Sequence, residues 1–138
     1  MSQDVEYRRG RHVVSAMHVH LVFVTRCRRN VFNDGMLRRC EEIMIEVCDN
    51  FEAELREFNG ADDHVHLLVH YPPKMAVSKL VNPLKGVSSL YLRREFTGHL
   101  NHVPMKGPFW SPSYLAASCG EAPHTLIKTY IERQRRPT

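Results

Sequence analysis

The sequence lacks the patterns that mark several large classes of protein. No apolar run approaches the roughly 20 residues of a membrane-spanning helix, and the polar, charged segment 1–10 does not resemble a signal peptide. The sequence has no P-loop or other glycine-rich phosphate cradle, no internal repeat and no low-complexity segment. We therefore expect one domain over residues 1–138, located in the cytoplasm, with no membrane partner.

The cysteines do not have the spacing of a zinc or disulfide framework. They stand at Cys27, Cys40, Cys48 and Cys119, without a C-x-x-C pair. Two of them fall in a predicted helix and one precedes another helix. Buried free thiols are therefore the favoured interpretation.

What the sequence has in excess is arginine. There are 19 Lys and Arg residues against 15 Asp and Glu, which gives a net charge of +4, and arginine dominates the basic clusters. The planar guanidinium suits bidentate contact with phosphate. The composition therefore permits a nucleic-acid partner, with a solvated basic surface as the alternative.

Hydrophobic periodicity predicts alternating strands and helices. We expect strands at 17–25, 51–58, 64–71 and 109–117, and helices at 34–49, 78–96 and 123–135. Asn33 or Asp34 can cap the first helix, Asn59-Gly60 supplies a turn, and 98–108 is a loop.

The order of these elements predicts the fold class. The order β-α-β-β-α-β matches an α+β fold, a ferredoxin-like or RRM-like antiparallel sheet with two helices on one face. The helix that follows is additional, and it either covers the other face or leaves the body across a hinge at Gly120. Pro83 either kinks the second helix or lies in its first turn with Asn82 as the cap, and Pro112 interrupts the fourth strand.

A pair of histidines in the third strand is the first candidate site. Alternation places His64 and His66 on one face of this strand, opposite an apolar face. Two imidazoles so placed can bind one metal ion and leave positions for a third ligand and a substrate. His18-Val19-His20 has the same form but lacks the preceding acid and the following Pro72-Pro73. We interpret it as a packing or DNA-facing pair, with a four-histidine zinc site as the alternative.

Tyr130 and Gln134 are four residues apart on the last predicted helix and therefore share a face. By itself Tyr130 has the pattern of a packing residue, because two isoleucines of the same helix have the same spacing. If the helix docks on the histidine face, His64, His66 and the Gln134 amide oxygen form a ligand set that suits Mg²⁺ or Mn²⁺. The metal would polarise a phosphodiester, and Tyr130 would attack phosphorus to form a phosphotyrosine without ATP.

These pieces in this order resemble the single-tyrosine HUH transposases of the insertion sequence 200/605 type. The resemblance runs from about 18 to 134. It is carried by the following segments: Val24-Thr25-Arg26-Cys27-Arg28-Arg29, Asp63-His64-Val65-His66-Leu67-Leu68-Val69, Pro72-Pro73, Leu84-Lys85-Gly86-Val87-Ser88-Ser89, Trp110-Ser111-Pro112-Ser113-Tyr114, Gly120 and Tyr130-Ile131-Glu132-Arg133-Gln134.

The resemblance implies a small homodimer that binds hairpins formed by the single-stranded ends of a mobile element. Single-strand cleavage would leave a 5′-phosphotyrosine and a free 3′-hydroxyl, and rejoining would complete excision or insertion. His64 and His66 correspond to the HUH ligands, Gln134 to the third ligand and Tyr130 to the nucleophile. Gly120 would be the hinge that lets the tyrosine helix complete the partner subunit's site.

Several basic residues lie within or beside these motifs, and we predict that they contact DNA. The alternative is that each is an ordinary surface residue. They are Arg26, Arg28, Arg29 and Lys85. Arg26-Cys27 stands where the family often has Lys-Tyr, which keeps the charge and loses an aromatic ring.

Two other functions are compatible with the sequence. One is a non-catalytic or domesticated hairpin-binding module. RRM-like sheets stack bases on exposed aromatic pairs, however, and the predicted open face here carries histidines. The other is a metal-dependent hydrolase, which would use water in place of Tyr130.

Overall fold

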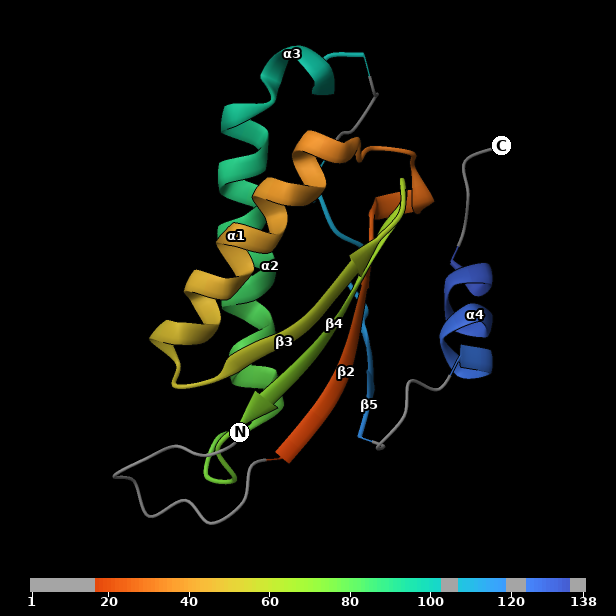
Figure 1. Cartoon of the computed structure of the whole chain (residues 1–138). Helices are drawn as coiled ribbons and strands as arrows, with labels where there is room; N and C mark the ends of the chain where they lie inside the picture. Colours follow the sequence, from red (N-terminus) through yellow and green to blue (C-terminus); the bar gives the residue numbers. More distant parts are fainter. Residues whose placement is uncertain (1–16, 103–106, 119–123, 135–138) are drawn as a thin grey trace.

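The fold is an antiparallel sheet between helices. The computed structural model describes residues 17–102, 107–118 and 124–134. Its sheet has the strand order β3-β4-β2-β5 (Figure 1). The strands are β2 (Met17–Val24), β3 (Glu54–Gly60), β4 (His64–Tyr71) and β5 (Leu115–Ala117). This order confirms the ferredoxin-like α+β fold expected from the sequence.

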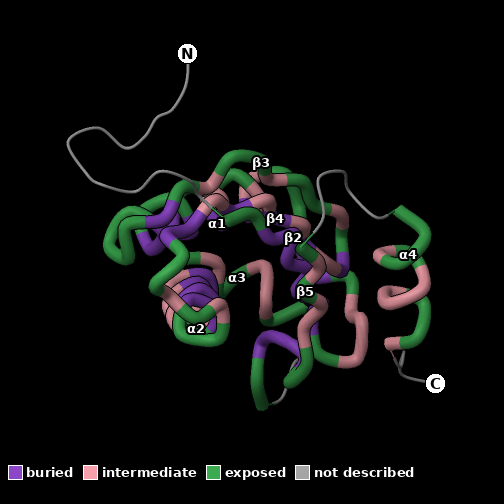
Figure 2. The backbone as a smooth tube through the Cα atoms, turned by 90° about the horizontal axis from the view of Figure 1, so that it is seen from below, coloured by how far each residue is buried: buried purple, intermediate pink, exposed green. Residues whose placement is uncertain are grey.

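The helices lie on both faces of the sheet. They are α1 (Asp34–Asn50), α2 (Val77–Glu95), the short α3 (Thr97–Leu100) and α4 (His124–Arg133). Figures 1 and 2 show α1 and α2 against one face, and α4 on the opposite side of the sheet beyond β2 and β5. Of the two positions expected for the last helix, the structure therefore has the one over the other face.

The alternation of β4 decides which side chains form the core. Val65, Leu67 and Val69 are fully buried against α1 and α2, and the histidines of the same strand point to the other face and are half-buried. In β2, Leu21 and Phe23 are buried on the same helix-covered side. Burying these side chains stabilises the sheet by roughly 1.5–3 kcal/mol each, and it fixes the register that places the histidines on the other face.

Local sequence explains how the two long helices begin and continue. The Asn33 side chain accepts a hydrogen bond from the Met36 backbone N–H at 2.8 Å, which confirms the predicted cap of α1. The second helix begins at Val77, before Pro83, and runs on through it. Leu80 and Leu84 are buried on either side of the proline, and their packing holds both parts of the helix in place.

Two boundaries near β3 differ from the expectation. The strand begins at Glu54 rather than at residue 51. The residues before it form the end of α1, because Glu52 has a left-handed backbone (φ 60°) and the Ala53 N–H donates a hydrogen bond to the Cys48 carbonyl. Asn59-Gly60 is not a turn: it pairs with His66 and Val65 of β4. The chain reverses just after it, and the Ala61 N–H bonds to the His64 carbonyl.

The expected strand over 109–117 is mostly replaced by a loop. Only Leu115–Ala117 pairs with β2 as a strand, and Trp110 makes one bridge to Thr25. Trp110 is 3% exposed because its ring packs in the core, and Pro112 has no N–H for a ladder. The loop predicted over 98–108 is wrong in its first residues, because α3 runs from Thr97 to Leu100.

The described cysteines are free thiols, as the sequence predicted. Cys40 and Cys48 are buried in α1, and burial raises the pKa of each thiol to about 12. Cys27 is half-buried, and Cys119 and the proposed hinge Gly120 lie outside the described residues. None of the helices in the described ranges has the length and apolar character needed to cross a membrane.

Candidate active site

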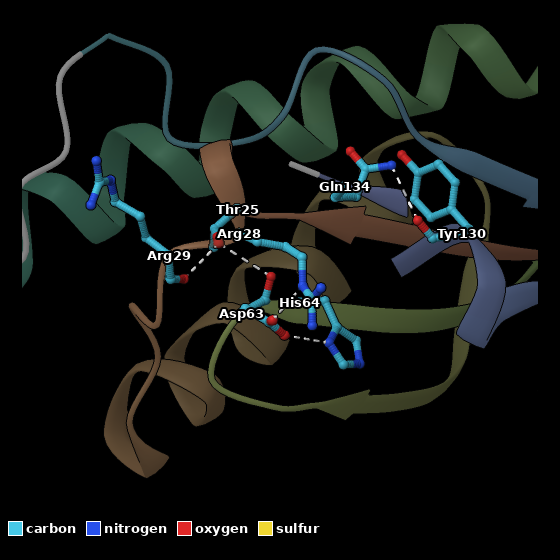
Figure 3. A network of polar contacts seen from close by, with 7 residues as sticks. All are labelled: Thr25, Arg28, Arg29, Asp63, His64, Tyr130 and Gln134. Atoms are coloured by element: carbon cyan, nitrogen blue, oxygen red, sulfur yellow. Dashed lines mark hydrogen bonds and ion pairs between the residues drawn. The ribbon is translucent and has the colours of Figure 1, made fainter. Parts of the chain in front are cut away.

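His64 stands at the start of β4 beside a buried carboxylate. Its Nδ1 lies 2.8 Å from Asp63 Oδ1, and the Arg28 Nε–H donates to Asp63 Oδ2 at 3.1 Å (Figure 3). Burial by itself would raise the pKa of the Asp63 carboxyl, but the hydrogen bonds from His64 and Arg28 outweigh it and hold that pKa below its usual value. Asp63 is therefore an ionised acceptor that orients the His64 ring.

His66 also has a partner, from the neighbouring strand. His20 Nδ1 lies 3.0 Å from His66 Nε2, and His20 is 2% exposed. His20 belongs to the pair that the sequence suggested for packing or DNA contact, and its burial assigns it to packing. Burial, and then the charge of His20, lower the pKa of His66, so its imidazole is favoured in the neutral form.

The other histidines of this face form a separate pair. His18 and His70 are directly opposite each other on β2 and β4, with ring centroids 3.9 Å apart and planes at 83°. Among the described residues, no group of three or more His, Cys, Asp or Glu side chains is arranged to hold a metal ion. The four-histidine zinc alternative, which would join His18 and His20 to His64 and His66, is therefore not formed within the described residues.

Tyr130 and Gln134 are both held by serines of the loop before β5. The Tyr130 hydroxyl lies 2.7 Å from Ser113 Oγ, and the Ser111 hydroxyl donates to Gln134 Oε1 at 3.2 Å. The Gln134 amide also donates to the Tyr130 carbonyl (Figure 3). Burial raises the pKa of the Tyr130 phenol, and the hydrogen bond to Ser113 opposes part of that rise.

Lys85 anchors this loop from the other side. The ammonium of Lys85, on α2, donates to the Ser111 carbonyl at 2.7 Å and to the Ser113 carbonyl at 3.2 Å. It also lies 5.8 Å from the centroid of the Phe23 ring, a cation–π distance. Burial lowers the pKa of Lys85. The sequence suggested Lys85 as a DNA contact. Its described contacts go instead to the loop before β5, which holds α4.

Replacing Lys85 tests this anchoring. Lys85→Met keeps an unbranched side chain and removes the ammonium, so two carbonyls lose their donor. We expect the free energy of unfolding to fall by about 1.5–3 kcal/mol, the range for hydrogen bonds to charged groups. Lys79→Met, at an exposed position of the same helix, should stay within about 0.5 kcal/mol of wild type. Equal losses in urea denaturation of the two variants would contradict the anchoring role.

The sequence-predicted residues thus fall into two groups. His64 and His66 lie on β4 and contact Asp63 and His20, and Tyr130 on α4 and Gln134 just after it contact the two serines. No hydrogen bond within the described ranges joins one group to the other. The groups do share one face of the sheet, because α4 lies on the side opposite α1 and α2, to which the histidines of β4 point (Figures 1 and 2).

The arginines nominated for DNA contact lie at the turn after β2. Arg26 is exposed, while Arg28 and Arg29 are half-buried. The Arg28 side chain is engaged with Asp63, and the Arg29 carbonyl accepts from the Thr25 hydroxyl at 2.7 Å (Figure 3). Arg26 therefore has the most accessible side chain of the three.

Sequence reasoning missed the two serines and the role of His20. Ser111 and Ser113 lie in the segment Trp110–Tyr114, which contributed to the resemblance, but serines on either side of a proline carry no pattern that predicts a tyrosine contact. The sequence shows Asp63 only as the acid that precedes the histidine pair. The serines, His20 and Asp63 each contact a residue far away in the sequence, and no local pattern predicts such a contact.

The donor types in this region fit a divalent cation. Asp63 engages His64 Nδ1 and leaves Nε2 as the remaining ring nitrogen. His66 is favoured neutral, which is the form that binds metals. The Gln134 amide oxygen accepts one hydrogen bond from Ser111 and has a second lone pair. Imidazole nitrogens and an amide oxygen are donor types that bind divalent cations.

Comparison with known proteins identifies the family. The model of the family described as "Transposase IS200 like" matches residues 13–134. The chain belongs to this family of IS200-like transposases. The resemblance found in the sequence is thereby confirmed.

Two relatives of this transposase cover most of its length. The transposase for insertion sequence element IS200 of Salmonella typhimurium is 33% identical over 115 residues, which are 83% of this chain and 74% of that protein. The ISDra2 transposase TnpA of Deinococcus radiodurans is 29% identical over 132 residues, which are 94% of this chain and 92% of that protein.

Solved structures share the fold of this transposase. A crystal structure of a transposase candidate from Deinococcus radiodurans R1 has a TM-score of 0.83 and 27% identity, and covers 95% of this chain and 100% of that one. The structure of a REP-associated tyrosine transposase bound to a REP hairpin has a TM-score of 0.57 and 14% identity, and covers 94% of this chain and 70% of that one. At 14% identity, the similarity to this second structure shows a shared fold.

Proposed function

We propose that this IS200-like transposase cleaves and rejoins single-stranded DNA through a covalent bond between Tyr130 and a 5′-phosphate. The observation that carries the proposal is the position of α4 on the histidine face of the sheet, with Tyr130 and Gln134 both hydrogen-bonded to the loop before β5. A nucleophile and an amide ligand are thus presented by one helix on the face that carries His64 and His66.

The chemistry is an exchange of phosphate esters. Tyr130 Oη attacks phosphorus, the bond from phosphorus to the 3′-oxygen breaks, and the tyrosine becomes esterified to the 5′-phosphate. The phenol proton is lost as the new bond forms, and the departing 3′-oxygen gains a proton to become a hydroxyl. Attack by a 3′-hydroxyl on the phosphotyrosine reverses the step and joins two DNA ends. One ester replaces another, so no nucleotide cofactor is needed.

His64, His66 and Gln134 are the residues that would hold a Mg²⁺ or Mn²⁺ ion. When bound, such an ion would supply charge neutralisation and orientation at the scissile phosphate. Ser113 holds the Tyr130 hydroxyl and Ser111 holds the Gln134 oxygen. Because the Gln134 oxygen has a second lone pair, it could bind the ion and keep its hydrogen bond from Ser111.

The proposed substrate is a hairpin formed by the single-stranded end of an insertion sequence, and the proposed assembly is a homodimer. The basic turn at Arg26 lies near His64, because the neighbouring Arg28 is bonded to Asp63. A DNA strand whose phosphate reaches His64 therefore passes an exposed guanidinium. Family membership supports the hairpin and the dimer, in which a hinge at Gly120 would let α4 move from the histidine face of its own chain to the partner's site.

Covalent trapping tests the proposal. The protein is incubated with Mg²⁺ or Mn²⁺ and single-stranded hairpin DNA from the element ends, labelled at the 5′ or the 3′ end in parallel reactions. On a denaturing gel we expect the 3′ label to migrate with the protein and the 5′ label to appear as a shorter free strand. EDTA should abolish both products. Binding without an adduct would favour the hairpin-binding module, and two free fragments would favour hydrolysis by water.

A further inference from the structure

Asp63 is held in two ways: two side chains contact its carboxylate, and its backbone carbonyl accepts hydrogen bonds. It is 4% exposed, and its two oxygens lie 2.8 Å from His64 Nδ1 and 3.1 Å from Arg28 Nε (Figure 3). The Asp63 carbonyl accepts from the Thr25 N–H at 2.9 Å and from the Thr25 hydroxyl at 3.2 Å. Asp63 is therefore held in one orientation by contacts with the turn after β2.

The turn that presents Arg28 has an unusual backbone. Cys27 and Arg28 are both left-handed, with φ of 58° and 56°, a conformation that side-chain-bearing residues rarely adopt. The Arg28 N–H bonds to the Thr25 carbonyl at 2.8 Å, and the Thr25 hydroxyl bonds to the Arg29 carbonyl at 2.7 Å. These bonds hold the strained turn, whose geometry aims Arg28 at Asp63.

We propose that Arg28 and Asp63 are positioning residues that keep the proton of His64 on Nδ1 and so leave Nε2 free to bind a divalent cation. An ionised carboxylate only accepts hydrogen bonds, so His64 must donate from Nδ1. The neutral ring then has its lone pair on Nε2, toward the cation site. The inference rests on the proposed function in one respect, namely that His64 is a ligand.

Arg28 decides which atom of residue 63 faces His64, because a guanidinium can only donate hydrogen bonds. In an Asp63→Asn variant, the amide oxygen must face Arg28 and the amide N–H₂ must face His64. His64 Nδ1 then has to accept, and the proton moves to Nε2, where it blocks the cation. If Arg28 is also replaced by Met, the amide can rotate and offer its oxygen to His64 again. The second substitution should therefore correct the first.

The tautomer can be read directly in the full-length, metal-free protein. Long-range ¹H–¹⁵N spectra distinguish the protonated ring nitrogen, and the His64→Gln spectrum identifies the His64 signals. We expect Nδ1–H in wild type, Nε2–H in Asp63→Asn, and Nδ1–H again in Asp63→Asn with Arg28→Met. Asp62→Asn, at the exposed neighbouring position, is the matched control and should not change the tautomer.

Binding of Mn²⁺ alone, followed by electron paramagnetic resonance, gives the second readout. We expect Asp63→Asn to weaken Mn²⁺ binding by about 10- to 100-fold, and the double variant to recover part of the loss. A purely structural role for Asp63 would instead make the double variant worse than the single one.

Two outcomes would overturn the inference: an unchanged tautomer in Asp63→Asn, or a changed tautomer with unaltered Mn²⁺ affinity. Failure of the proposed function is distinguishable from both. It would appear as a wild-type protein without a DNA adduct, while the tautomer and Mn²⁺ measurements still decide the roles of Arg28 and Asp63.

Discussion

Tyr130→Phe is expected to abolish the covalent DNA adduct and strand cleavage, with a loss of more than about a thousandfold, because no other group replaces the attacking oxygen. Hairpin binding should persist, since the substitution removes one hydroxyl and leaves the ring in place. The lost hydrogen bond goes to Ser113, which is exposed, so the free energy of unfolding should fall by no more than about 1 kcal/mol. The adduct is measured on a denaturing gel and binding by fluorescence anisotropy.

A matched control separates the loss of the nucleophile from the loss of any tyrosine hydroxyl. Tyr91→Phe removes a hydroxyl on α2, where the ring lies beside Arg39 and Arg94 on the face of the sheet opposite α4 (Figure 1). This variant should form the adduct at the wild-type rate. Cleavage by Tyr130→Phe at a comparable rate would show that water, or another side chain, attacks the phosphate, and the proposed mechanism would then be wrong.

Removing either of the proposed metal ligands on β4 should have an effect of similar size. We expect His64→Ala and His66→Ala each to lower metal-dependent cleavage by more than about a hundredfold and to weaken Mn²⁺ binding, because one nitrogen donor is lost. Hairpin binding measured in EDTA should change little. His66→Ala also leaves the buried His20 without its partner, so its thermal unfolding must be recorded beside its activity.

The same sheet face supplies the control for this pair. His18 and His70 occupy the same two strands and contact each other directly. His18→Ala and His70→Ala should therefore retain metal-dependent cleavage. Loss of Mn²⁺ binding in these variants, together with its retention in His64→Ala and His66→Ala, would move the metal site to the other histidine pair.

Much of the fold was predictable because its causes are local. The alternation of β4 predicted that Val65, Leu67 and Val69 would be buried and the histidines would face away, and this is what the structure has. The cap at Asn33 was equally predictable, because a side-chain acceptor and the N–H it satisfies are three residues apart. Such features depend on neighbours in the sequence and need no knowledge of the rest of the chain.

The boundaries that were mispredicted depend on distant packing. Trp110 has a sequence environment typical of a strand, but its ring is buried in the core and its indole N–H donates to Ser88 on α2 at 3.0 Å. The loop that follows is held by Lys85 instead of by a strand ladder. No pattern within 109–117 contains this information, because the residues that decide it lie on another element.

Local patterns in the chain were enough to predict the fold class, the face of β4 that carries His64 and His66, and the resemblance that led to the family. These follow from the two-residue period of a strand and from motifs whose residues are close together in the chain. The contact of Asp63 with Arg28, the support of His66 by His20, and the serines that hold Tyr130 and Gln134 became visible in the folded chain. A hydrogen bond needs two atoms within about 3 Å, and these partners are 17 to 46 residues apart in the sequence, so folding has to bring them together.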